Sequence, residues 1–198
     1  MIMNYESILA ALKPEAKPKA LNVSAEWLTR VAQFMANRGY RHNADSLKAL
    51  EAYLAGYDIL LTGSFGVGKT FFFDCLSTAT APIVRLNMNE AHLWKYDDLA
   101  DFLRDNRGND MVIDDIRGDI GKDYGKAYDP LIVILENRFE VRARTHYTTN
   151  LTNEELIERL DHRDVDRLYT AKPFVIRRDE SLRSPLPNSF YVSQLKNR

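Results

Sequence analysis

A glycine-rich segment at residues 63–70 constrains the fold of this chain more than any other feature of its sequence. It reads GSFGVGKT and fits the pattern G-x-x-x-x-G-K-[ST] in full. An apolar run at Asp58–Thr62 precedes it and an expected helix at Lys69–Ser77 follows it, which is the strand–loop–helix context of a phosphate-binding loop. The predicted phosphate-binding residues are Gly63, Ser64, Phe65, Gly66, Val67, Gly68, Lys69 and Thr70.

The residue types in this loop suit the chemistry of a nucleoside triphosphate. Glycines let backbone N–H groups turn towards phosphate oxygens without Cβ clashes, and the N-terminus of a helix adds partial positive charge. Lys69 is expected to supply a point charge for the β- and γ-phosphates, and the Thr70 hydroxyl is expected to ligate Mg²⁺. The alternative is a glycine-rich turn that binds no ligand.

Two adjacent carboxylates follow an apolar strand further along the chain. Asp114 and Asp115 come directly after Met111–Ile113, and Asp114 lies 45 residues beyond Lys69. Downstream of a phosphate loop, such a pair predicts that Asp114 holds Mg²⁺ and that Asp115 orients and polarises the attacking water. The alternative is a pair of solvated carboxylates in a turn.

Two other classes of nucleotide-binding protein fit the sequence poorly. A small GTPase would need an N-K-x-D element for guanine, and the chain has none. A nucleoside or nucleotide kinase would need an arginine-rich lid and an acceptor pocket, and no segment indicates either. A second acid directly after the Mg²⁺ acid instead favours water as the nucleophile, and therefore hydrolysis.

Strand and helix patterns alternate from residue 57 onward, which predicts a parallel sheet with helices on both faces. The expected strands are 58–62, 83–86, 111–113, 146–149 and 174–176. The expected helices are 5–12, 25–37, 44–55, 69–77, 96–106, one starting at Asp129 and Pro130, one starting with the capping box Thr152 to Glu155, and 164–169. The predicted organisation is an N-terminal helical segment and linker at 1–42 and a nucleotide-binding core at 43–198.

Composition excludes several further classes of protein. Of 198 residues, 45% are hydrophobic and 28% are charged, and the net charge of −1 gives no overall positive field for nucleic acid or anionic membranes. The single cysteine, Cys75, excludes an internal disulfide framework, and the four histidines lack metal-ligand spacing. No run approaches the roughly 18 apolar residues of a membrane span, and no secretory signal is evident. A cytoplasmic location without membrane association is therefore expected.

Polar residues in the last third of the chain complete the predicted site. The strand at 146–149 ends in Asn150, which can sense a γ-phosphate and position water, although asparagine is also a common turn residue. Arg163 and Arg167 lie four residues apart and share one face if 164–169 is helical. We interpret Arg167 as an arginine finger for a neighbouring subunit's nucleotide, with Arg163 in support, and surface ion pairs are the alternative.

Taken together, these elements resemble the DnaC/IstB-like branch of AAA+ ATPases, which comprises bacterial and phage helicase loaders and transposition ATPases. The resemblance covers roughly two-thirds of the chain, from Tyr57 to Arg183. Besides the phosphate loop, it rests on VIDDI at 112–116, TTNLT at 148–152, HRDVDRL at 162–168 and DESLR at 179–183.

This resemblance implies both a fold and an activity. The implied fold is a three-layer α/β P-loop core with a five-stranded parallel sheet, a short N-terminal helical segment and no C-terminal helical lid. The strand that ends at Asn150 is expected between the phosphate-loop strand and the strand of the two acids. The implied activity is hydrolysis of Mg²⁺-ATP in DNA replication, with Asn150 as first sensor, Arg167 as finger and Arg183 in a less defined role. The implied partners are a homo-oligomer in a ring or spiral, a replicative helicase and single-stranded DNA.

Three departures from the family pattern leave other functions open. The segment before residue 43 is short for a helicase-binding domain, 87–110 holds one full helix where loaders carry an extra one, and Arg117 replaces a small residue. The alternatives are an IstB-like ATPase that acts with a transposase, and a nucleotide-gated interaction module with negligible turnover. If single-stranded DNA binds, the expected basic groups are Arg138, Arg142 and Arg144, or 122–126.

Overall fold

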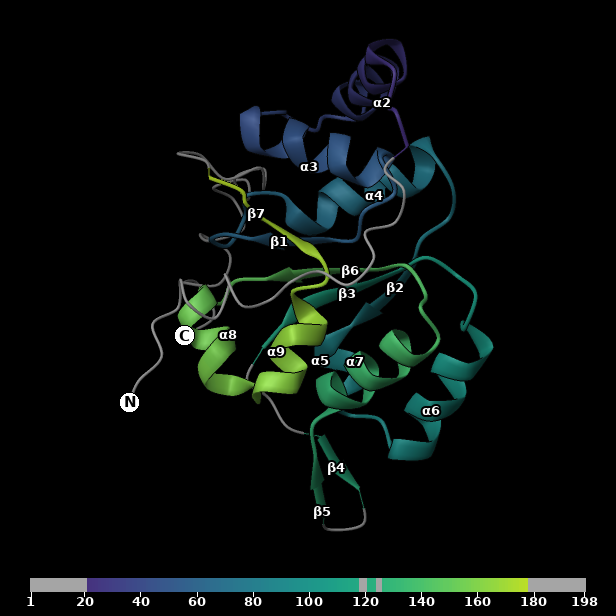
Figure 1. Ribbon diagram of the computed structural model, residues 1–198, viewed down its shortest axis with the longest axis vertical. Helices are drawn as coiled ribbons and strands as arrows, with labels where there is room; N and C mark the ends of the chain where they lie inside the picture. The colour runs from purple at the N-terminus through teal and green to yellow at the C-terminus, as the bar shows by residue number, and fades with distance from the viewer. Residues whose placement is uncertain (1–20, 118–120, 124–125, 178–198) are drawn as a thin grey trace, which may run out of the picture.

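Five parallel strands form the central sheet of the molecule. The computed structural model describes residues 21–117, 121–123 and 126–177, and Figure 1 shows the sheet between two layers of helices. The order of the strands across the sheet is β2-β3-β6-β1-β7, so β6 lies between β1 and β3 as expected, and the predicted five-stranded parallel sheet is confirmed. The strands are β1 (Ile59–Thr62), β2 (Val84–Asn87), β3 (Met111–Ile116), β6 (Thr145–Thr149) and β7 (Lys172–Val175).

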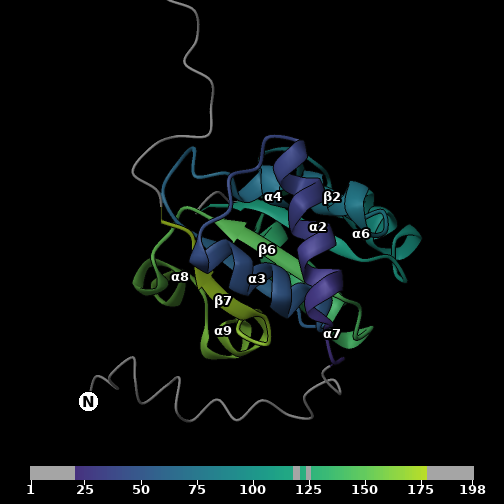
Figure 2. The same ribbon diagram turned by 90° about the horizontal axis from the view of Figure 1, so that it is seen from above.

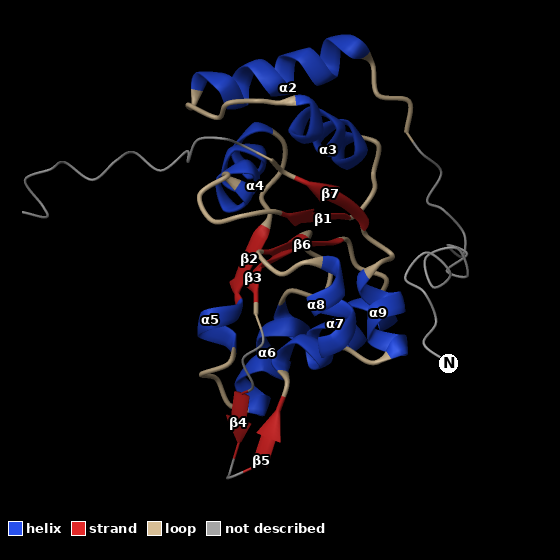
Figure 3. Ribbon diagram, turned by 90° about the vertical axis from the view of Figure 1, so that its left-hand side faces the viewer, coloured by secondary structure: helices blue, strands red, loops and turns tan. Residues whose placement is uncertain are grey.

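Helices cover both faces of this sheet, as Figure 3 shows. Successive residues of β1 serve the two layers, because Ile59 and Leu61 pack into one hydrophobic cluster and Leu60 into the other. One layer consists of α2 (Ala25–Asn37), α3 (Ala44–Leu54) and α4 (Lys69–Ala79). The other consists of α5 (Met88–Ala91), α6 (Tyr96–Asp105), α7 (Pro130–Glu140), α8 (Asn153–Arg159) and α9 (His162–Leu168).

Side-chain caps form at two helix starts that the sequence indicates. Asp129 accepts a hydrogen bond from the backbone N–H of Leu131 at 2.9 Å, and Pro130 occupies the first turn of α7. Thr152 and Glu155 make both hydrogen bonds of the predicted capping box, at 3.2 Å and 2.7 Å. These contacts satisfy backbone N–H groups that the first turn of a helix leaves unpaired.

Helix α2 is the outermost helix of its layer and lies across α3 and α4 (Figure 2). Helical spacing places Trp27, Val31, Phe34 and Met35 on one face of α2, and of these Val31 and Met35 are buried in the same cluster as Phe72 of α4. The other two residues of this face, Trp27 and Phe34, are 36% and 39% exposed. Helix α2 thus shares a core with the helix that follows the phosphate loop, and a domain boundary at residue 42 stays a prediction.

Helical spacing predicts a buried stripe at Leu47, Leu50 and Leu54 of α3 and another at Leu131, Leu135 and Phe139 of α7, and each prediction is wrong for one residue. Leu47 of α3 and Phe139 of α7 are 38% and 49% exposed, whereas the remaining members are buried or partly buried. Helix α3 turns its small residues Ser46 and Ala49 towards the core, where both are fully buried. A stripe read only from large apolar side chains overlooks such small residues and therefore misplaces the buried face.

Several elements differ from the sequence-based expectations. Strand β3 runs three residues further than expected and includes both acids, and α5 adds a single turn between β2 and α6. A hairpin of β4 (Gly121–Asp123) and β5 (Lys126–Tyr128) extends away from the sheet below α6 and α7 (Figure 1). The helix predicted at 5–12 and the absence of a lid after residue 177 concern parts of the chain outside the described residues. Within the described ranges, no helix is long and apolar enough to cross a membrane.

The ring of His146 is fully buried at the start of β6. Its Nδ1 accepts a hydrogen bond from the backbone N–H of Ile59 at 3.2 Å. Burial, followed by the charges of Arg144 and Arg138, holds the pKa of His146 well below its ordinary value of 6.5. This histidine is therefore neutral in the folded chain and forms part of the core.

We expect His146 to make the stability of the fold depend on pH. Its depressed pKa contributes stability that is fully present above about pH 6.5 and is lost as the pH falls below that value, at about 1.4 kcal/mol per pH unit. Burial also raises the pKa of Asp58 to about 6, which opposes this trend below pH 6. Denaturant unfolding of the wild type and of His146→Gln is measured between pH 5 and 8. The contribution of His146 is the difference between the two proteins in the slope of unfolding free energy against pH.

A matched control for this experiment is His162→Gln, which removes an exposed histidine. Parallel pH profiles for the wild type and His146→Gln would contradict the assignment of a neutral, buried imidazole.

Candidate nucleotide-binding site

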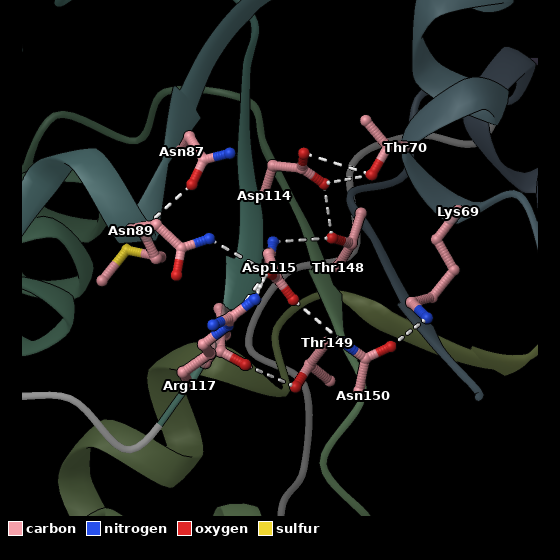
Figure 4. A network of polar contacts seen from close by, with 12 residues as sticks. Lys69, Thr70, Asn87, Asn89, Asp114, Asp115, Arg117, Thr148, Thr149 and Asn150 are labelled. Atoms are coloured by element: carbon pink, nitrogen blue, oxygen red, sulfur yellow. Dashed lines mark hydrogen bonds and ion pairs between the residues drawn. The ribbon is translucent and has the colours of Figure 1, made fainter. Parts of the chain in front are cut away.

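Lys69 and Thr70 of the phosphate loop, the two acids and Asn150 meet at the carboxyl edge of the sheet, which Figure 4 shows from close by. Thr62, the last residue before the phosphate loop, pairs with Thr149 of β6, and Asp114 of β3 pairs with Asn87 of β2. Ligands of open α/β sheets bind in the crevice at this edge. The topology therefore places the phosphate loop, both acids and Asn150 around one region.

The backbone of the phosphate loop explains its glycines. Gly63 has a φ of +140°, and a Cβ atom at this position would lie 2.4 Å from the carbonyl oxygen of Ile176. Gly68 has a φ of +93° at the N-cap of α4, in the left-handed region. Gly63 is required for space, because the loop passes close to the end of β7. Gly68 is required for its conformation, and no side-chain cap covers the backbone N–H groups at the start of α4.

Lys69 lies inside this loop with 8% of its surface exposed. Its Nζ donates hydrogen bonds to the carbonyl oxygens of Gly63 at 2.7 Å and Ser64 at 3.0 Å, and to Oδ1 of Asn150 at 2.7 Å. The loop therefore holds the ammonium group at the sheet edge, where it can exchange these acceptors for phosphate oxygens. Phe65, at the opposite extreme, is 67% exposed.

Thr70, at the start of α4, and Asp114 of β3 lie within hydrogen-bond distance of each other. The Thr70 hydroxyl lies 2.9 Å and 3.2 Å from the two carboxylate oxygens of Asp114, whose Oδ1 also accepts a hydrogen bond from Thr148 at 2.7 Å. A hydroxyl and a carboxylate fit Mg²⁺, which takes few protein ligands and completes its shell with phosphates and waters. Among the described residues, no group of three or more His, Cys, Asp or Glu side chains offers an all-protein cage.

Asp115 projects from a bulge in β3, where the pairing with β6 shifts between Ile113 and Ile116. Its φ of +61° is unusual for a residue with a side chain, and its backbone N–H donates to Oγ1 of Thr148 at 2.9 Å. The bulge turns Asp115 out of the alternation of the strand. Both neighbouring acids therefore face the site edge, which regular β-geometry would forbid.

Asn150 connects the phosphate loop to the second acid. Its Nδ2 donates to Oδ1 of Asp115 at 2.9 Å while its Oδ1 accepts from Lys69, so one amide bridges the two charged groups (Figure 4). An amide that contacts both groups can respond to a phosphate that enters between them. The predicted neighbourhood of Lys69, Asp115 and Asn150 is thus present in the structure, and the chemical role of each stays a prediction.

Two residues of this network were not predicted as part of the site. Asn89 of α5 donates to Oδ2 of Asp115 at 3.1 Å, and Arg117 donates to the same oxygen through Nε at 2.9 Å and a terminal nitrogen at 2.5 Å. The sequence signals Arg117 only as a departure from the family pattern. Asn89 follows a strand end, but its helix α5 was not expected, so its approach to Asp115 was not expected either.

The two arginines of α9 differ sharply in exposure. Arg167 has a side chain that is 5% exposed, and it donates to Asp164 at 2.8 Å and to Glu136 of α7 at 3.1 Å. Arg163 is 70% exposed and lies 3.8 Å from Glu136. In this arrangement the guanidinium of Arg167 serves the contact between α7 and α9, and a finger role for it would require these ion pairs to open.

The basic group proposed for DNA near β6 is wrong for Arg138. This side chain is 2% exposed and donates to the carbonyl oxygens of Asn106, Asn109 and Arg144, so it holds loop ends together inside the protein. Burial lowers its pKa. Arg144 is also engaged, with Asp110 at 3.2 Å. The side chains at 122–126 lie outside the described part of the structure.

Comparisons with known proteins agree with this fold. No family model matches the chain, and no curated protein matches it. Among solved structures, AMPPCP-bound DnaA from Aquifex aeolicus is similar over 81% of this chain and 54% of its own, with 15% identity and a TM-score of 0.54. The DnaC helicase loader is similar over 88% of this chain and 100% of its own, with 19% identity and a TM-score of 0.50. The chain thus spans about half of that DnaA chain, and it shares the α/β fold of these two structures.

Proposed function

We propose that this chain binds and hydrolyses Mg²⁺-ATP and acts in DNA replication as a DnaC-like helicase loader. The observation that carries the proposal is the continuous network from Lys69 through Asn150 to Asp115 at the carboxyl edge of the sheet. A phosphate loop alone is common to many nucleotide-binding proteins. The carboxylate of Asp115, which is connected to Lys69 through the amide of Asn150, adds the group that can act on the attacking water.

Each polar side chain has a distinct task in this proposal. Lys69 and the N-terminus of α4 bind the phosphates and offset their charge. Thr70 and Asp114 would hold Mg²⁺, which when bound neutralises the phosphates and orients them. Asp115 accepts a hydrogen bond from the attacking water, and Asn150 orients that water against the terminal phosphate.

The proposed partners follow from the fold and from the resemblance in sequence. A replicative helicase is proposed because the DnaC helicase loader shares the fold along its entire length. We also propose a head-to-tail homo-oligomer in a ring or spiral, in which an arginine of α9 reaches the nucleotide of the next protomer. Arg163 is the arginine of α9 that offers its guanidinium to the outside, whereas Arg167 would have to leave a buried ion pair. We further propose that the chain binds single-stranded DNA and acts in the cytoplasm.

The experiment that tests this function measures ATP hydrolysis by the chain alone, with single-stranded DNA, and with the replicative helicase of the same host. We expect Mg²⁺-dependent hydrolysis that rises faster than linearly with protein concentration and changes when the helicase is added. Absence of nucleotide binding would contradict the proposal as a whole. A response to a transposase and double-stranded DNA in place of the helicase would favour the transposition ATPase, and binding without turnover would favour the nucleotide-gated module.

A further inference from the structure

The carboxylate of Asp115 is held asymmetrically by its neighbours. Three hydrogen bonds converge on Oδ2, two from the guanidinium of Arg117 and one from the amide of Asn89. Oδ1 accepts a single hydrogen bond in the described structure, from Asn150. Because a carboxylate oxygen has about two lone-pair sites, Oδ2 is saturated and Oδ1 keeps room for another donor.

The remaining capacity of Asp115 lies on the side of the phosphate loop. Asn150, the partner of Oδ1, is also the partner of Lys69, whereas Arg117 approaches the carboxylate from the other side (Figure 4). A water molecule that attacks a phosphate beside Lys69 can therefore reach Oδ1 and not Oδ2. The contacts at Oδ2 select which oxygen faces the reaction.

Asp115 needs these contacts because its own backbone does not fix the direction of its side chain. The residue lies on a bulge with a φ of +61°, so no regular strand geometry orients its side chain. Two donors from one rigid, planar guanidinium fix the position of Oδ2, and the hydrogen bond from Asn150 to Oδ1 then sets the rotation of the carboxylate. Within the described residues, each hydrogen bond of the Arg117 side chain goes to Asp115, so the arginine has no second structural task there.

The contact between these two side chains is not a source of fold stability. The side chains of Arg117 and Asp115 are 46% and 21% exposed. Ion pairs this accessible to water contribute little to stability. Removal of the arginine should therefore leave the fold intact and expose its effect on the reaction.

We propose that Arg117 is a positioning residue for ATP hydrolysis, which holds Oδ2 of Asp115 so that Oδ1 receives the attacking water. This inference rests on the proposed function and adds to it a residue that acts through Asp115. Arg117 was noted in the sequence only as an unusual replacement after the strand of the acids. The donors of its guanidinium orient the carboxylate of Asp115, which the bulged backbone does not do.

The test compares the steady-state ATPase kinetics of the wild type with those of Arg117→Ala and Arg117→Lys. We expect Arg117→Ala to lower kcat by about 10- to 100-fold, because a displacement of about 1 Å at a reacting group costs about that much, and to leave KM for ATP unchanged. Arg117→Lys should recover part of kcat, since lysine keeps one charged donor but not the fork. In an Asp115→Asn background, Arg117→Ala should lower kcat no further, because both changes act through the same carboxylate.

A matched control is Arg85→Ala, which removes another half-exposed arginine from an ion pair, with Asp74 at 3.0 Å. Its side chain is 48% exposed, close to the value for Arg117, and it should hydrolyse ATP as the wild type does. Unchanged or faster hydrolysis by Arg117→Ala would overturn the inference, and faster hydrolysis would identify the arginine as a brake. A wild-type chain that binds no ATP or does not hydrolyse it would instead remove the proposed function itself, and this inference with it.

Discussion

Asp115→Asn is expected to bind Mg²⁺-ATP as tightly as the wild type and to hydrolyse it about 10²–10⁴-fold more slowly. A positioned general base contributes a factor of that size, and an amide cannot accept the proton of water. Among the described residues, the carboxylate accepts hydrogen bonds from Asn150, Asn89 and Arg117, and it is connected to the phosphate loop through Asn150. Loss of the carboxylate should therefore slow the attack of water and leave the affinity for the nucleotide unchanged. Titration with a fluorescent ATP analogue, combined with single-turnover hydrolysis, measures the two effects separately.

The exposed ion pair between Asp74 of α4 and Arg85 of β2 provides a control for this substitution. Asp74 is half-exposed and pairs with Arg85, so Asp74→Asn removes a carboxylate of similar type away from the network of Figure 4. It should leave both binding and hydrolysis unchanged. An equal loss of ATP binding and hydrolysis in Asp115→Asn would show that the acid holds the nucleotide or its metal, and would contradict the division of roles between the two acids.

Arg167→Ala is expected to lower the free energy of unfolding by about 3–5 kcal/mol, because it leaves a buried carboxylate without its cation. The side chains of Arg167 and Asp164 are 5% and 4% exposed, and their nitrogen and oxygen atoms lie 2.8 Å apart. Glu136, the second partner of the arginine, is 44% exposed and can turn to water. Asp164 has no such option, since α9 packs this residue against the core. Chemical denaturation followed by circular dichroism measures the loss.

Two further variants separate the ion pair from other causes of instability. Arg163→Ala removes an arginine that is 70% exposed from the same helix and should change stability by less than about 1 kcal/mol. Adding Asp164→Asn to Arg167→Ala removes the unpaired charge and should restore a large part of the loss. If Arg167→Ala is as stable as Arg163→Ala, Arg167 is not committed to this pair and is available as a finger.

Residue types and spacing in the sequence predict which residues lie close together at the candidate site. The loop at 63–70 and the acids at the end of β3 follow patterns set by phosphate and Mg²⁺, and the topology brings both to one edge of the sheet. Parallel strands make this convergence general, since all their carboxyl ends lie on the same side. The expected place of β6 between β1 and β3, implied by the resemblance, also brings Asn150 to that edge.

Other features depend on tertiary contacts that no local pattern reveals. The pairing of Arg117 with Asp115 requires a bulge and a positive φ, and neither follows from the run of apolar residues before the acids. The burial of Arg138 depends on carbonyl groups from loops about 30 residues away in sequence. The same holds for Arg167, whose partner Glu136 lies on another helix. Charged side chains in a sequence are expected at the surface, and only the folded chain shows which of them are buried.

The central claim is that the loop at 63–70 holds the phosphates of Mg²⁺-ATP, and direct titration of ATP into the wild type and into Lys69→Ala tests it. Lys69 is 8% exposed and its ammonium group is held by loop carbonyls, so no other side chain of the described loop can replace its charge. Isothermal titration calorimetry in the presence of Mg²⁺ should show one ATP per wild-type chain and no detectable binding to Lys69→Ala, with both proteins equally folded by circular dichroism. Equal affinity of the two proteins for ATP, or no binding to the wild type, would contradict the account.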